Sequence, residues 1–134
     1  MVWQPHQRTL DTFAVTGGTA AQTGGATTAV EFMVGTGTDN IATYQMDGGS
    51  IAVTPSTKSS DGTSVAGSFR VGDFGGTGIF NQTAGTVAVD GSLNIGNQGG
   101  DGTYNLSGGT LNLNEGGLST LGRTSGSNTT YGGS

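Results

Sequence analysis

The residues that could carry chemistry in this chain are few and widely spaced. Two carboxylates that converge in a cleft can act as acid and base on glycans, and several oxygen ligands together can bind calcium. Asp73 and Asp101, with Asp39, lie in turns of similar composition and are the best candidates for a metal site. One carboxylate per turn is sparse for calcium, and the single histidine, His6, lies close to the N-terminus. We therefore expect no metal, no cofactor and no catalytic residue.

Composition and charge exclude several classes of partner. The 134 residues include 4 Lys and Arg against 9 Asp and Glu, so a basic surface for nucleic acid is not expected. No apolar run approaches the roughly 18 residues of a membrane helix. The first residues contain no apolar segment typical of a signal peptide. Because cysteine is absent, disulfide scaffolds and thiolate sites are also excluded.

One motif recurs along the chain: an aromatic residue, three further residues, a Gly-Gly or Ala-Gly pair and a hydroxyl residue. Copies begin near residues 12, 43, 79 and 103, and a fifth starts at 130. A second marker, two apolar residues separated by one residue and followed by glycine, lies between the copies. Phe80 to Tyr104 and Phe69 to Leu93 are both 24 residues apart, so the two markers share one period. This pattern indicates an internal repeat.

The other units are longer than the period, and we expect their extra residues to form loops. Tyr44 to Phe80 spans 36 residues, with the excess in a polar stretch at residues 55–67. Phe13 to Tyr44 spans 31 residues, with the excess placed around residues 22–29. We expect an N-terminal segment or cap at residues 1–11, repeats over residues 12–129, and the truncated start of a fifth repeat at residues 130–134.

Within each unit apolar and polar residues alternate, which is typical of β-strands. Three short strands in each 24-residue unit indicate an all-β fold, a parallel β-solenoid (β-helix) of about four triangular coils. Equivalent strands of successive coils would pair in parallel about 4.8 Å apart. The rival fold is an antiparallel β-sandwich, but it gives no reason for residues to recur every 24 positions.

Stacked coils would bring equivalent side chains into columns. We expect an internal aromatic column formed by Phe13, Tyr44, Phe80 and Tyr104. Asn81 and Asn105 are expected to form an amide ladder. Gln82 falls at an inward position, so its amide should pair with a neighbouring coil, because an unsatisfied buried amide is costly. The other residues expected in the core are Met46, Ile51, Val53, Phe69, Val71, Val87, Val89, Leu93, Ile95, Leu106, Leu111 and Leu113.

The segments at residues 78–89 and 102–113 resemble the Gly/Thr/Asn-rich β-strand repeats of large bacterial surface and secreted proteins, including autotransporter passengers. The resemblance is close over residues 78–122 and looser over residues 12–54. It implies a β-helix fold and an extracellular or cell-surface location. It implies no active site, because those repeats carry no catalytic motif.

These observations favour a structural protein over an enzyme. We expect a β-solenoid rod or filament subunit, or a segment of a longer one, that stacks head to tail on a second copy or on adjacent repeats. One alternative is a glycan-binding or adhesive module that uses outward Thr, Asn and Gln and the loop at residues 55–67. Another is a non-catalytic fragment of a polysaccharide-lyase-like β-helix. An ice-binding Thr-x-Thr array is not favoured, because only residues 36–38 show that spacing cleanly.

Overall fold

The computed structural model describes residues 9–57, 64–115, 120–121 and 129–132. These residues form strands and turns; no helix in this part of the chain is long and apolar enough to cross a membrane. The strands are β1 (Thr9–Val15), β2 (Gly18–Gln22), β3 (Ala26–Thr36), β4 (Ile41–Met46), β5 (Ser50–Val53), β6 (Ser56–Thr57), β7 (Ser64–Val65), β8 (Gly67–Asp73), β9 (Thr77–Gln82), β10 (Thr86–Asn97), β11 (Asp101–Leu106), β12 (Thr110–Glu115), β13 (Thr120–Leu121) and β14 (Thr129–Gly132).

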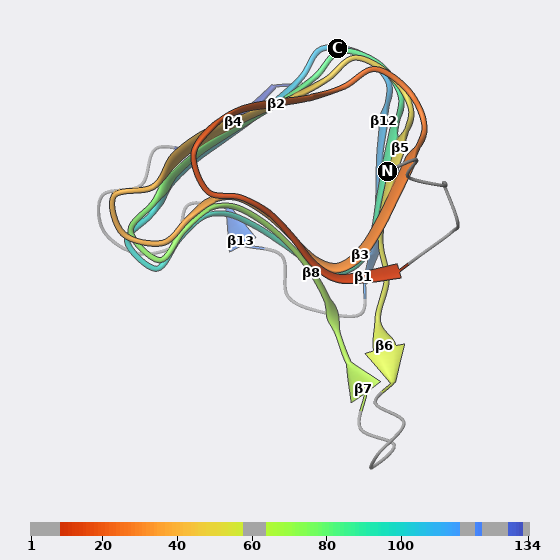
Figure 1. Ribbon diagram of the computed structural model, residues 1–134, viewed down its shortest axis with the longest axis horizontal. Coiled ribbons are helices and arrows are strands. Elements are labelled where there is room, and N and C mark those ends of the chain that lie inside the picture. The colour runs from red at the N-terminus through yellow and green to blue at the C-terminus, as the bar shows by residue number, and fades with distance from the viewer. Residues whose placement is uncertain (1–8, 58–63, 116–119, 122–128, 133–134) are drawn as a thin grey trace, which may run out of the picture.

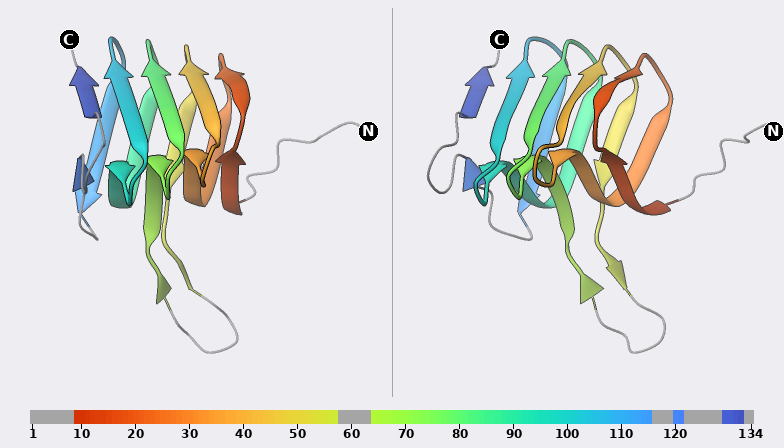
Figure 2. Two further views of the ribbon diagram at one scale, coloured as in Figure 1. Left: turned by 90° about the vertical axis from the view of Figure 1, so that its left-hand side faces the viewer. Right: turned by 60° about the vertical axis from the view of Figure 1, so that its left-hand side comes forward.

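The strands form two large parallel sheets. The first, sheet A, has seven strands along the path β1-β3-β5-β10-β12, with β8 and β13 also paired to it. The second, sheet B, has five strands in the order β14-β11-β9-β4-β2, which lie side by side in Figure 2 (left). The chain passes repeatedly between the two sheets. The expected all-β fold with parallel strands is therefore confirmed.

The register of both sheets follows the period read from the sequence. Tyr104 pairs with Phe80 in sheet B, and Leu93 pairs with Phe69 in sheet A. Strands of successive repeats overlie one another around one interior when viewed as in Figure 1. Because side chains alternate along a strand, every second residue points into this interior.

Strand β10 bends, so that its two halves pair with different strands. Its residues 86–89 pair with β5, and its residues 91–97 pair with β8. Strand β3 is divided in the same way between β5 and β8. Sheet A therefore covers the interior along two directions, and sheet B closes the remaining side (Figure 1).

Glycine makes the crossing from β8 toward sheet B possible. Gly72 has a φ of +64°, a conformation that residues with a Cβ rarely adopt. A Cβ at this position would also lie 1.8 Å from the backbone oxygen of Asp101 in the next repeat. The close approach of two backbones thus requires glycine here.

The insertion expected at residues 55–67 forms a hairpin. Strands β6 and β7 pair antiparallel and project away from the two large sheets in both views of Figure 2. On either side of the hairpin the repeat register resumes, because Val53 pairs with Val89 and Gly67 pairs with Gly91. The hairpin is therefore an addition between two strands of sheet A.

The prediction of an insertion around residues 22–29 is wrong. Ala20 pairs with Tyr44 and Gln22 with Met46, so this repeat keeps the plain 24-residue spacing. The aromatic motif equates Phe13 with Tyr44 because both residues are aromatic. The residue in the equivalent position is Ala20, and the glycine pair at residues 24–25, 24 residues before the pair at 48–49, was the signal that would have shown it.

The expected boundaries fall partly within the described chain. Strand β1 begins at Thr9, inside the expected N-terminal segment, and pairs with β3. Strand β14 pairs with β11 where a fifth repeat was expected. Residues 1–8, with His6, and residues 133–134 lie outside the described residues.

Candidate functional site

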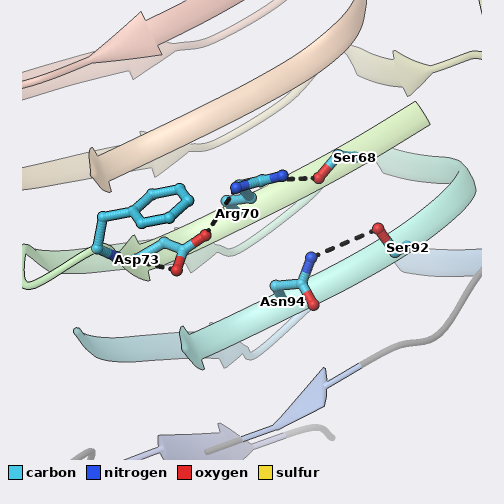
Figure 3. A network of polar contacts seen from close by, with 6 residues as sticks. Ser68, Arg70, Asp73, Ser92 and Asn94 are labelled. Atoms are coloured by element: carbon cyan, nitrogen blue, oxygen red, sulfur yellow. Dashed lines mark hydrogen bonds and ion pairs between the residues drawn. The ribbon is translucent and has the colours of Figure 1, made fainter. Parts of the chain in front are cut away.

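A polar network lies on the outward face of β8 and β10. Ser68 and Arg70 alternate with the inward residues of β8, and Ser92 and Asn94 do so on β10. The parallel register places Ser68 beside Ser92 and Arg70 beside Asn94. Figure 3 shows these side chains on one face of the two neighbouring strands.

Arg70 is the centre of this network. Its Nε donates to Ser68 Oγ at 2.9 Å, and its Nη1 lies 3.0 Å from Asp73 Oδ2 (Figure 3). Its guanidinium carbon also lies 5.4 Å from the centroid of the Phe74 ring, within the range of a cation–π contact. On the neighbouring strand, Asn94 Nδ2 donates to Ser92 Oγ at 3.4 Å.

Asp73 is a fully buried carboxylate at the end of β8. Its side chain has 0% exposure, whereas that of Arg70 has 23%. The second carboxylate oxygen accepts from the backbone N–H of Phe74 at 2.9 Å. Burying an ionised carboxylate is costly unless it is paired and hydrogen-bonded, and both conditions are met here. The ion pair therefore allows a charged residue to be buried at the end of β8.

The turn after Asp73 leaves one aromatic ring in solvent. Phe74 and Gly75 have φ values of 51° and 79°, and Gly76 N donates to Asp73 O at 3.1 Å, which is the geometry of a type I′ turn. The Phe74 side chain is 44% exposed. An exposed ring beside a guanidinium can contact a sugar ring or another chain.

The metal candidates differ in their surroundings, and Asp39 lies exposed in a turn with a φ of 65°. Asp73 pairs in register with Thr36 and Asn97 in sheet A and is held by Arg70, whereas Asp101 is exposed and pairs with Thr77 in sheet B. Within the described residues no group of three or more His, Cys, Asp or Glu side chains could hold a metal ion.

The aromatic column expected from the sequence needs one correction. Tyr44, Phe80 and Tyr104 stack in sheet B, with ring centroids 5.2 and 4.8 Å apart. Phe13 does not belong to this column; it stacks on Phe32 in sheet A at 4.8 Å and meets Tyr44 only edge-on. The reason is that β1 pairs with β3, so Phe13 shares the register of the second marker instead of the first.

A second aromatic column was not expected. Phe32 stacks on both Phe13 and Phe69, with centroids 4.8 Å apart in each case. Phe32 and Val34 are fully buried, although neither was placed in the core from the sequence. The recurring apolar-x-apolar-Gly marker contains both residues and was the signal that would have identified them.

The other expected core residues lie mostly inside. Leu106 and Leu111 are partly buried against the core. Leu113 is 42% exposed, which corrects its placement in the core: within the described chain β12 pairs only with β10, so one side of this residue is uncovered. The fully or nearly fully buried members are Met46, Ile51, Val53, Phe69, Val71, Val87, Val89, Leu93 and Ile95.

Polar side chains link successive repeats both inside and outside. On the outer face of sheet B, Asn105 Nδ2 donates to Asn81 Oδ1 at 2.8 Å. Asp47 Oδ1 accepts from the Thr83 hydroxyl at 2.6 Å and from the Gln45 amide at 2.7 Å, and these two bonds lower the pKa of Asp47. Asn81–Asn105 joins the neighbouring strands β9 and β11, and Thr83–Asp47 joins the turns that follow the neighbouring strands β9 and β4. The Gln45–Asp47 bond lies within one repeat.

Inside, a glutamine amide and a tyrosine hydroxyl pair across two repeats. Tyr104 Oη donates to Gln82 Oε1 at 2.5 Å, and both side chains are buried. Tyr44 Oη donates to Gln22 Oε1 at 2.7 Å in the same way. Burial raises the pKa of Tyr44 to about 12. The second pair was missed because residues 19–26 contain no aromatic residue and were not recognised as a repeat.

No protein-family model, curated protein or solved structure matches the chain. Any function must therefore be argued from the geometry described above.

Proposed function

We propose that the chain is a segment of a parallel β-solenoid with a structural role, a rod that continues by stacking coils at its ends. The observation that carries the proposal is the shared register of the two sheets. Equivalent residues pair with equivalent residues at 24-residue spacing in both, as at Phe80–Tyr104 and Phe69–Leu93. Three runs of strand per repeat around one interior correspond to one coil of such a solenoid.

Stacking at the ends follows from the sheet edges. Within the described residues the edge strands of sheet A are β1, β12 and β13, and those of sheet B are β14 and β2. Each edge strand leaves backbone N–H and C=O groups directed away from its sheet, which is a template for another strand. Strand β2 contains no lysine, proline or charged residue that would protect its edge. A second copy, or further repeats of a longer chain, would pair there.

We further propose a bacterial cell-surface or extracellular setting. This part of the proposal rests on the resemblance of residues 78–122 to the repeats of surface and secreted proteins. Low charge suits such a stack, because like charges placed at equivalent positions would lie about 4.8 Å apart and repel.

Negative-stain electron microscopy of the purified chain over a concentration series tests the proposal. We expect unbranched filaments or rods whose length grows with concentration. Particles that stay monomeric at the highest concentration would reject assembly between copies. A circular dichroism spectrum without a β-sheet signal would reject the solenoid itself.

One observation favours glycan binding as a second function. Phe74 is 44% exposed beside Arg70, and an aromatic ring next to hydrogen-bond donors is suited to a sugar. Affinity electrophoresis in gels containing neutral or acidic polysaccharides tests this. We expect retardation of the native chain that is lost in Phe74→Ala and kept in Ile41→Ala, whose side chain is also exposed but lies on sheet B.

A further inference from the structure

Each of the two buried Tyr–Gln pairs joins one repeat to the next through more than one bond. Gln82 Oε1 accepts from Tyr104 of the following repeat, and Gln82 Nε2 donates to Gly85 O at 3.1 Å and to Thr110 O at 3.0 Å. Thr110 also belongs to the following repeat, at the start of β12. The amide thus has a partner for its oxygen and for both of its N–H groups, as a buried amide requires.

The same arrangement occurs at Gln22. Its Nε2 donates to Gly25 O at 3.3 Å and to Ser50 O at 3.0 Å, while Oε1 accepts from Tyr44. In both pairs the glutamine precedes its tyrosine by 22 residues. The arrangement is therefore a repeated feature of the chain.

The repeat between these two replaces both partners together. Met46 lies in register with Gln22 on one side and Gln82 on the other. The aromatic residue of the following repeat is then Phe80, which has no hydroxyl. Neither an amide nor a hydroxyl is left without a partner at this step.

Methionine and glutamine occupy the same place in the interior. A Cβ added at Gly85 would meet Met46 Cε at 2.9 Å, and one added at Gly109 would meet Gln82 Nε2 at 2.9 Å. The two side chains therefore reach equivalent positions over equivalent glycines. What distinguishes the two sites is the chemistry presented to the next aromatic residue.

We infer that this position selects which repeat can stack on which: glutamine accepts a repeat that carries tyrosine, and methionine accepts one that carries phenylalanine. As a rule for choosing a stacking partner the inference rests on the proposed function, although the pairing itself occurs within one chain of the structure. Its physical basis is the cost of a buried hydroxyl or amide that lacks a partner.

A repetitive chain needs such a rule, because a slip by one whole repeat keeps the apolar pattern intact. If β11 skipped β9 and paired with β4, Tyr104 would meet Met46 and its hydroxyl would lose its acceptor. Gln82 would lose a donor at the same time. The pairs therefore disfavour a slipped order that apolar packing alone tolerates.

A double-mutant cycle tests the inference by urea unfolding of the full chain at a concentration where it is monomeric. Gln82→Met removes the acceptor of the Tyr104 hydroxyl and the Nε2 bonds to Gly85 O and Thr110 O, whereas Tyr104→Phe removes only the donor to Gln82 Oε1. Each variant should lower the ratio of folded to unfolded chain about 5- to 100-fold. The double variant recreates the Met46–Phe80 pair, so its loss should be smaller than the product of the two single losses. The inverse cycle, with Met46→Gln, Phe80→Tyr and both together, should behave alike.

Losses that simply multiply in both cycles would overturn the inference, since the two positions would then act independently. The inverse cycle decides the matter if Gln82→Met does not fold. Because unfolding is followed in monomers, a failure to form filaments would overturn the proposed assembly and leave the cycles interpretable.

Engineered disulfides would report whether the strands keep the native register. The chain has no cysteine, so Asn81→Cys with Asn105→Cys tests one pair of register partners. Gln45→Cys with Asn105→Cys joins strands that are neighbours only if β9 is skipped, and two strand spacings are too long for a disulfide. We expect the first pair to cross-link and the second to stay reduced; efficient cross-linking of the second pair in the native background would overturn the inferred selection.

Discussion

Asp73 and Arg70 show how a charge is accommodated in a chain that has few. The carboxylate is fully buried, and its partners are one guanidinium and one backbone N–H. The sequence marked Asp73 as a turn residue and a metal candidate, and nothing in it indicated an ion pair. Arg70 follows Phe69 in a strand and reads as a solvent-facing residue, so only the fold brings the two charges together.

Arg70→Met should destabilise the protein by about 3 kcal/mol, near the low end for breaking a buried ion pair, because the arginine is partly exposed. Asp73 would then be a buried charge without a counterion. Urea unfolding measures the loss. Adding Asp73→Asn should recover part of it, and an equal loss in both variants would show that Arg70 acts through packing alone.

Tyr44 should make stability fall at high pH. Its folded-state pKa of about 12 lies above the ordinary value of 10.0, so the folded chain holds the phenolic proton more tightly than the unfolded chain. Its stabilising contribution is complete below pH 10 and is lost as pH rises toward 12, by up to about 1.4 kcal/mol per pH unit. Unfolding free energies of the native chain and of Tyr44→Phe between pH 9 and 12 should therefore converge; parallel curves would contradict this.

At the scale of strands and turns, the glycines and the inserted hairpin determine which substitutions and deletions the fold tolerates. The 24-residue period predicted the parallel register and the insertion after Val53 correctly. It did not predict which glycines are essential, because that depends on how closely the neighbouring repeat approaches. Gly72 and Gly25 both have a positive φ, yet only Gly72 has another backbone within contact of the missing Cβ.

Gly72→Ala should therefore cost at least about 3 kcal/mol, from the unfavourable φ and from the overlap with Asp101 O. Gly25→Ala is the matched control, since its φ is +78° and nothing lies within 4 Å of an added Cβ. We expect a cost of about 1–2 kcal/mol there. Thermal and urea unfolding compare the two, and equal costs would mean that the close approach has no energetic consequence.

Deleting residues 55–66 should leave the fold intact. The deletion joins Thr54 to Gly67 and restores a 24-residue spacing between Thr54 and Asp90. Gly67 already lies 24 residues before its register partner Gly91. Within the described chain β6 and β7 pair only with each other, so little packing is lost. We expect the same β-sheet circular dichroism and a free energy of unfolding within about 1 kcal/mol of the native chain. A collapse of stability would show that the hairpin supports the sheets.

At the scale of the whole molecule, the edge strands of the two sheets determine where another strand could pair. Two parallel sheets share one interior, and each has edge strands paired on one side only within the described residues. Leu113 illustrates the consequence. Its sequence position is equivalent to that of Val89, which is fully buried, but Leu113 lies on an edge strand and is 42% exposed. A strand added beyond β12 would cover it.

Leu113→Lys should block stacking without unfolding the chain, because a charge directed inward at an edge would be buried by an added strand. We expect the concentration needed for half-maximal assembly to rise at least about tenfold, or about 1.4 kcal/mol. Light scattering with electron microscopy measures it. Ile41→Lys, an exposed position on β4 with strands on both sides, is the control and should assemble normally.

The sequence by itself determined the strand type, the 24-residue period and most of the side chains that line the interior, because alternation and repetition are local properties of the chain. Only the tertiary structure decided the rest. It placed Phe13 with Phe32 instead of Tyr44, showed that Ala20 stands in the aromatic position, and paired Gln22 and Gln82 with tyrosines of the next repeat. These partners depend on which strand lies beside which, and a motif built around aromatic residues does not recognise a repeat that contains none.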